Sequence, residues 1–218
     1  MQLSLTQPCC LGMSLLLLIS SLLPWEHVIS TPDDQMFNEE LYNKLISISH
    51  RTHIVARKMY KNLDVKLSKG RWFKNSGNNT CRTASIPTTK KTEVLLKVVI
   101  NVSNAWKYPL KLLTPAVLTH LGSYDGMLAR AVEVKYGCEA ILEGAKVLLS
   151  RVQPGIEENN YPDWPELKQL RSSNKDTHLS AFHTLFYCLY KDIQKVNRYL
   201  KILRRRVIKK QQMLSIKP

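Results

Sequence analysis

The sequence lacks the motifs on which the common classes of enzyme depend. Beyond residue 30 it contains no nucleophile motif, glycine-rich phosphate loop, HExxH zinc motif or close pair of carboxylates. The histidines after that point are scattered along the chain, at His50, His53, His120, His178 and His183. We therefore expect that the protein is not an enzyme and uses neither a cofactor nor a resident metal.

Long apolar runs are also missing, with one exception near the N-terminus. The run over residues 11–23 is shorter than the roughly 20 residues that a membrane helix needs, which favours a signal peptide over an N-terminal anchor. Val28 and Ser30 stand at acceptable positions before a cleavage site. We predict that residues 1–30 are a signal peptide and that residues 31–218 form one secreted domain without a membrane span.

Charge and glycosylation motifs fit a protein outside the cell. The chain has 17 acidic residues against 32 Lys and Arg, a net charge of +15, and cleavage after Ser30 would remove no basic residue. In a secreted protein this charge predicts contact with sulfated glycans or anionic cell surfaces, and no nucleic-acid partner is expected. N-glycosylation motifs at Asn78 and Asn101 agree with this location.

The number of cysteines after residue 30 is odd. Two of the five cysteines lie in the predicted signal peptide, so Cys81, Cys138 and Cys188 remain. An odd number in an oxidising compartment predicts one disulfide and one further thiol, or a bond between two chains. Spacing alone does not choose the pair.

Apolar residues repeat every three or four positions in four segments, which predicts an all-α fold. The expected helices cover residues 35–68, a segment that begins near Thr92, residues 125–152, and a long segment that includes 182–207. Pro109 is expected to kink or end the second helix. No run of strict polar–apolar alternation predicts a strand.

The connections between these segments differ in length. Residues 69–91 and 153–174 form long connections, whereas the second and third helices are joined by a short link. Two long crossovers predict the up-up-down-down order of a long-chain four-helix cytokine bundle, because parallel neighbours need a connection that crosses the length of the bundle. A lipid-binding bundle of the apolipoprotein type is the alternative, but it normally has short hairpin links.

Short motifs follow one another along the chain. They are CRTAS at 81–85 with AWKYPL at 105–110, LEG at 142–144, EENNYPDW at 157–164 and CLYKD at 188–192. In this order they resemble the signatures of the somatotropin and prolactin family, in particular its rodent placental members. The resemblance covers nearly the whole chain after residue 30. It implies a secreted hormone that binds a class I cytokine-type receptor, with the prolactin receptor as a candidate.

The resemblance also implies a disulfide between Cys81 and Cys188. Such a distant bridge contributes about 4 to 5 kcal/mol in the chain-entropy model. The short terminal bridges of prolactin are absent, and Cys138 is additional. Because Cys138 lies on the apolar stripe of the third helix, two interpretations stay open: a buried thiol in a monomer, or a disulfide-linked dimer.

By the same resemblance, the first receptor site lies on the outer face of the last helix and part of the first. Aromatic and basic side chains, which are common in binding hot spots, occur on that face at Tyr187, Lys191, Gln194, Lys195 and Arg198. His50 and His53 add two imidazoles that can face solvent, contact a receptor or bind zinc. Gln194 replaces a further histidine, so we expect no metal site.

Small residues on the third helix suggest a groove. Gly137, Ala140 and Gly144 share a flank about 100° from its apolar stripe. The family resemblance implies a second receptor site there, in which a receptor aromatic side chain enters beside Gly144 and one hormone bridges two receptor chains. The alternatives are close packing of a loop on these glycines, or sequence drift without a functional role.

The end of the last helix is strongly basic. The cations exceed what the favourable interaction with a helix C-terminus explains, and they are Lys201, Arg204, Arg205, Arg206, Lys209 and Lys210. They predict binding to heparan sulfate, either beside receptor binding or as the main activity of a matrix-binding factor. A family member that acts through another partner is the remaining alternative.

Overall fold

The computed structural model describes residues 34–67, 81, 83, 91–121, 126–152 and 164–215. Contacts divide the chain into two compact units, Met1–Asp34 and Gln35–Pro218, and the helical bundle lies in the second. The predicted signal peptide and Asn78 lie outside the described residues. Within these ranges, every helix is too short or too polar to cross a membrane.

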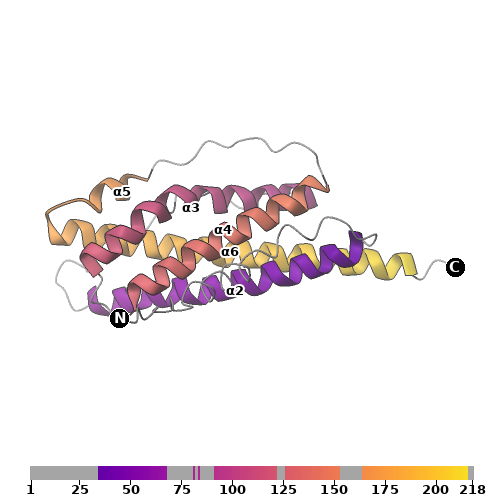
Figure 1. Ribbon diagram of the computed structural model, residues 1–218, viewed down its shortest axis with the longest axis horizontal. Coiled ribbons are helices and arrows are strands. Elements are labelled where there is room, and N and C mark those ends of the chain that lie inside the picture. Colours follow the sequence, from indigo (N-terminus) through magenta and orange to yellow (C-terminus); the bar gives the residue numbers. More distant parts are fainter. Residues whose placement is uncertain are drawn as a thin grey trace, which may run out of the picture. The chain divides into compact units, whose positions relative to one another are not determined.

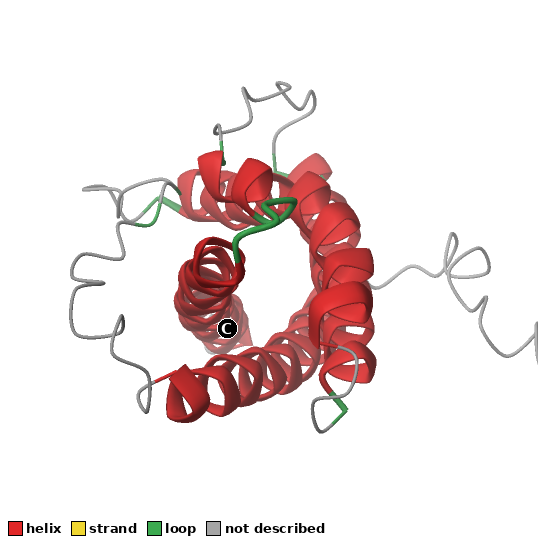
Figure 2. Cartoon of the chain, turned by 90° about the vertical axis from the view of Figure 1, so that its left-hand side faces the viewer, coloured by secondary structure: helices red, strands yellow, loops and turns green. Residues whose placement is uncertain are grey.

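The described ranges are helical and contain no strand, as the sequence predicts (Figures 1 and 2). The helices are α2 (Asp34–Leu67), α3 (Thr92–Leu121), α4 (Met127–Ser150), α5 (Pro165–Gln169) and α6 (Lys175–Ser215). The bounds of α2 and α4 lie close to the predicted ones. The short helix α5 falls in the second long connection, where Pro165 in its first turn favours a helix start.

Helix α3 is longer than expected because it continues through Pro109 and Pro115. The prediction that Pro109 could end this helix is wrong. A proline in a helix interior costs about 3 kcal/mol, since it removes one N–H donor and crowds the preceding turn. The side chains of Trp106, Leu110 and Val117 are all buried around these prolines, and each contributes roughly 1.5–3 kcal/mol on burial. Their packing outweighs the cost.

Contacts at both ends of α6 fix the topology. Arg204 near its end reaches Glu39 at the start of α2, and His183 near its start reaches Asp64 at the end of α2. Further contacts give the same antiparallel relation for α6 with α3 and for α4 with α2, in the pairs Arg206–Thr92, His178–His120, Arg151–Asn38 and Arg51–Glu133. The order is therefore up-up-down-down, as predicted (Figure 1).

The apolar stripe predicted for the last helix forms a large part of the core. Its members from Phe182 to Leu203 are buried, as the three-four repeat requires, and Val207 is half-buried. The third helix was predicted to continue to residue 152, and this extension is wrong. Helix α4 ends at Ser150, and the Val152 N–H donates to the Leu149 carbonyl three residues back at 2.9 Å. The Val152 side chain is half exposed.

The glycine flank of α4 is closed by α2. A Cβ atom at Gly144 would lie 2.5 Å from Cδ2 of Leu45, and one at Gly137 would collide with the Thr52 side chain. Leu45 and Thr52 are both buried. The prediction of an open groove for a receptor side chain beside Gly144 is therefore wrong, and the segment that packs on the glycines is helix α2 rather than a loop. The missing side chains let two helices approach, rather than leaving space for a partner.

The first long connection is fastened to α6 by a disulfide. Cys81 and Cys188 are bonded, with an S–S distance of 2.13 Å, and they are 107 residues apart in the sequence. This is the pair that the family resemblance implies. The remaining thiol, Cys138, is free and buried, and burial raises the pKa of its sulfur. The structure thus favours the buried, unreactive thiol over the disulfide-linked dimer.

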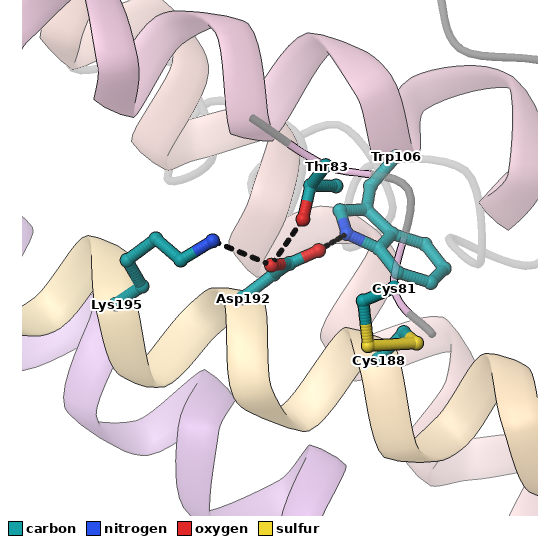
Figure 3. Close-up of a disulfide and its surroundings, with 6 residues drawn as sticks. All are labelled: Cys81, Thr83, Trp106, Cys188, Asp192 and Lys195. Atoms are coloured by element: carbon teal, nitrogen blue, oxygen red, sulfur yellow. Dashed lines mark hydrogen bonds and ion pairs between the residues drawn. A yellow bond between two sulfur atoms is a disulfide. The ribbon is translucent and has the colours of Figure 1, made fainter. Parts of the chain in front are cut away.

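Next to the disulfide, one buried carboxylate joins three segments (Figure 3). Asp192 of α6 accepts hydrogen bonds from the Thr83 hydroxyl at 2.6 Å and from the Trp106 indole N–H at 2.8 Å. The Lys195 ammonium donates to the same carboxylate at 3.3 Å. Burial raises the pKa of Asp192, and the bond from Thr83 and the charge of Lys195 oppose that rise. Both signature motifs, around Cys81 and Cys188, therefore meet at this carboxylate.

The pKa of Asp192 gives the stability of the protein a pH dependence of defined sign. Because its pKa is raised on folding, the folded state binds this proton more tightly than the unfolded chain, in which Asp titrates near about 3.9. Proton binding by Asp192 therefore stabilises the folded state at low pH. This stabilisation should be lost as the pH rises from about 4 through the raised pKa. Asp192→Asn removes the titrating proton. We expect the parent-minus-variant difference in unfolding free energy, measured by urea denaturation, to fall with rising pH. A flat or rising difference would contradict this account.

The contact between α2 and α4 predicts an unfavourable glycine-to-alanine change. Alanine is favoured over glycine in a helix by about 1 kcal/mol, but overpacking costs about 1–3 kcal/mol. Thr52 cannot easily yield, since it is β-branched and its hydroxyl donates to the Ile48 carbonyl at 2.8 Å. We expect Gly137→Ala to lower the free energy of unfolding by about 1 kcal/mol.

A double-mutant cycle with Thr52→Ala checks the cause. Thr52→Ala removes the larger side chain and should relieve the collision. The double variant should therefore lose less unfolding free energy than the two single variants together, by at least about 0.5 kcal/mol. Additive changes, or a Gly137→Ala variant that is more stable than the parent, would show that the two helices do not approach this closely.

Candidate functional site

The outer face of α6 carries four of the seven residues predicted for the first receptor site. Tyr187, Lys191, Gln194 and Arg198 follow one another at three- and four-residue steps, so they share one side of the helix. Gln194 and Arg198 are exposed, whereas Tyr187 and Lys191 are half-buried. Helix α2 runs antiparallel beside this face. The sequence thus places an aromatic and basic surface along the α2–α6 seam.

Three tyrosines pack together at this seam, and we call Tyr60, Tyr187 and Tyr190 the tyrosine cluster. The Tyr60 ring of α2 stacks on Tyr190 at 5.7 Å and meets Tyr187 edge-on at 5.4 Å. The ammonium of Lys191 lies 5.6 Å from the Tyr187 ring centroid and 5.2 Å from that of Tyr190. Such contacts hold the rings in place, and rigid aromatic side chains contribute contact area at low entropic cost.

The two predicted histidines of α2 differ in their surroundings. His50 is exposed, whereas His53 is half-buried. The His53 ring lies 5.6 Å from that of Tyr190, and its Nδ1 is 3.3 Å from the Tyr190 carbonyl oxygen. Burial lowers the pKa of His53, although the bond to Tyr190 opposes this. His53 is therefore held at the tyrosine cluster, and among the described residues no group of three metal-ligating side chains occurs.

Sequence reasoning missed the residues beneath this surface. His183 is almost fully buried, and its Nε2 lies 3.0 Å from Oδ1 of Asp64. The Tyr60 ring covers His183 at 5.2 Å. A weak signal was available, because Tyr60 stands seven residues after His53 and so lies two turns along the same face of α2.

One predicted contact residue has a different role. Lys195 was expected on the solvent-facing side of the last helix, but its side chain is only 23% exposed and its ammonium contacts the buried Asp192. The reason is its position one turn after Asp192, on the side of α6 that faces α3. Lys195 therefore has a structural role at Asp192, and its contact with a receptor stays a prediction.

The basic residues at the end of α6 divide into two groups. Lys201, Arg205 and Lys209 are exposed. Arg204 instead pairs with Glu39 at 3.3 Å, and Arg206 donates to the Thr92 hydroxyl at 3.4 Å. Both of these are half-buried, and the side chain of Lys210 lies outside the described residues. The predicted basic face is thus narrower than the sequence suggests.

Asn101, the glycosylation candidate within the described residues, lies inside α3. Its side chain is half-buried, and the serine of its motif, Ser103, is buried. A glycan at this position would have to be attached before α3 packs. Asn101 therefore stays a prediction.

The sequence and its motifs agree with comparisons to known proteins. The sequence model of the somatotropin hormone family matches residues 17–212. Prolactin-3C1 of Rattus norvegicus is 64% identical over 209 residues, which are 96% of this chain and 99% of the relative. Prolactin-3C1 of Mus musculus is 55% identical over 210 residues, with the same coverage of both chains. Prolactin-3D1 of Mus musculus is 41% identical over 219 residues, 95% of this chain and 98% of the relative. The chain therefore belongs to the somatotropin hormone family, and it is a prolactin-like hormone rather than an enzyme.

Proposed function

We propose that this protein is a secreted placental hormone that binds a class I cytokine-type receptor through the α2–α6 seam. The apolar segment over residues 11–23 and the cleavage motif before residue 31 support secretion. A placental source rests on the resemblance of its motifs to those of the rodent placental members of the family. The prolactin receptor is the first candidate receptor.

The tyrosine cluster is the observation that carries this proposal. Its rings present apolar area, hydroxyl groups and the Lys191 cation within one surface, and these are the chemical types enriched at binding hot spots. Exposed Gln194 and Arg198 of α6 and His50 of α2 lie on the same two helices and supply polar groups for a rim. Because the rings already pack against one another, little side-chain entropy is lost when a partner covers them.

Lys191→Ala tests this surface. The change removes the cation above two tyrosine rings at a half-buried position, so we expect binding to the receptor ectodomain to weaken about tenfold or more. Surface plasmon resonance with the prolactin receptor and other class I receptor ectodomains would measure it. Lys135→Ala is the matched control, because Lys135 lies 5.7 Å from the Tyr136 ring on α4, outside the proposed seam.

The control variant should bind within about twofold of the parent. Equal weakening by both variants would argue against the α2–α6 seam. Failure of the parent protein to bind any class I receptor ectodomain would remove the receptor proposal itself.

A second candidate function is binding to heparan sulfate, and the exposed basic ridge favours it. We define this ridge as Arg198, Lys201, Arg205 and Lys209, which are all exposed. At 1.5 Å and 100° per residue these side chains lie within an arc of about 80° and span about 16 Å along α6. A row of cations at this spacing suits a linear chain of sulfate groups. The ridge continues the side of α6 that carries Tyr187 and Lys191.

Removing charges from the ridge tests whether it binds heparan sulfate. We expect replacement of Lys201, Arg205 and Lys209 by Gln to lower the salt concentration at which the protein elutes from heparin, because fewer counterions are exchanged. The matched control replaces Lys58, Lys61 and Lys168, three exposed lysines elsewhere. Similar elution of both triple variants would show that net charge, and not the ridge, determines retention. Elution of the parent below physiological salt would exclude heparan sulfate as a partner.

A further inference from the structure

A pocket between α3 and α5 lies outside the surfaces already described. Its apolar wall is formed by Leu112, Pro115 and Ala116 of α3, together with Leu167 of α5 and Leu170 just after it. The volume is about 220 Å³, whereas a cavity of roughly 150 Å³ already holds benzene. It is smaller than the roughly 300 Å³ at which sites for drug-sized ligands begin. The pocket therefore suits a small hydrocarbon group.

The polar groups that line this pocket are basic or neutral. Arg171, His120 and Thr119 complete the lining, and none of the described residues that line it is acidic. Glu166 is next to Leu167 in the sequence but is not part of the wall. The Thr119 hydroxyl donates to the Pro115 carbonyl at 3.0 Å within the helix. The guanidinium of Arg171 thus supplies the formal charge, and it is positive.

The imidazole at the pocket is held in position by its neighbours. The His120 ring stacks on that of His178 with centroids 4.4 Å apart. His178 is fixed in turn, because its Nδ1 lies 3.3 Å from the Ser172 carbonyl oxygen and its ring meets Phe182 edge-on. A donor that is already ordered loses little entropy when a ligand arrives.

We propose that this pocket binds a small amphipathic carboxylate, with the hydrocarbon tail against the α3–α5 wall and the carboxylate at Arg171 and His120. The positive charge of Arg171 favours an anionic ligand. A carboxylate suits this position, because arginine forms paired hydrogen bonds with a carboxylate. Volume limits the tail to about eight carbons. This site is separate from the α2–α6 seam, so it can fail or succeed independently of receptor binding.

Octanoate is the probe for the test, with octanol as a neutral ligand that has the same tail. We expect calorimetric titration of the full chain to show one saturable octanoate site with a dissociation constant on the order of 0.1 mM. Octanol should bind at least about tenfold more weakly, because it leaves the arginine without a charged partner. No saturable octanoate binding, or equal binding of the two ligands, would overturn the proposal.

Variants locate the site. Arg171→Gln should weaken octanoate about tenfold and change octanol less than about twofold. Ala116→Trp should fill the pocket and abolish binding of both. The matched control is Lys168→Gln, an exposed residue of α5 that does not line the pocket, and it should bind as the parent does.

Circular dichroism and the melting temperature would show that each variant is folded. If Ala116→Trp does not fold, Arg171→Gln decides, since Arg171 is exposed and its side chain can be replaced without a change in the core. Unchanged octanoate binding in a folded Arg171→Gln or Ala116→Trp variant would overturn the proposal.

Discussion

The carboxylate of Asp192 is buried in the bundle, where an ionised group without partners would oppose folding by several kcal/mol. Its partners come from three places: Thr83 in the first long connection, Trp106 in α3, and Lys195 in α6 itself. A packing of the same helices that moved any one of them away would leave charge or donors unsatisfied. Such a group adds little net stability to the folded state, but it raises the free energy of other packings of the same helices. It therefore specifies which arrangement forms, while the adjacent disulfide limits how far the first connection can separate from α6 (Figure 3).

The functional surfaces follow from this constraint on α6. With Asp192 and Cys188 facing inward, another side of the helix faces outward, and the residues toward that side are Tyr187, Lys191 and then the basic ridge. The proposed receptor surface and the proposed glycan surface therefore share one helix side. A long glycan on the ridge would lie next to the tyrosine cluster, so the two partners would influence each other through space and charge, without any change in the fold.

The fold could be predicted because its signals are periodic and local. Three-four repeats defined the helices, and the lengths of the connections gave their order. Features that depend on a neighbouring helix could not be found in this way. The glycines of α4 were recognised as a flank, but the repeat of one helix does not say that Leu45 of another fills it. Lys195 was placed on the correct helix, yet its pairing with Asp192 depends on where α3 and the first connection lie. The disulfide was predicted from the family resemblance, since spacing left the pair undetermined.

The pocket between α3 and α5 is connected to the same buried carboxylate. Trp164 precedes α5 directly, and its ring lies 4.5 Å from that of Trp106, whose indole N–H donates to Asp192. The start of α5 is therefore fixed by the network that fixes α6. A ligand can shift a conformational equilibrium only by its difference in affinity for two states. Because the start of α5 is anchored in this way, a carboxylate in the pocket would mainly stabilise the existing position of α5. The receptor surface on the α2–α6 seam would keep its geometry.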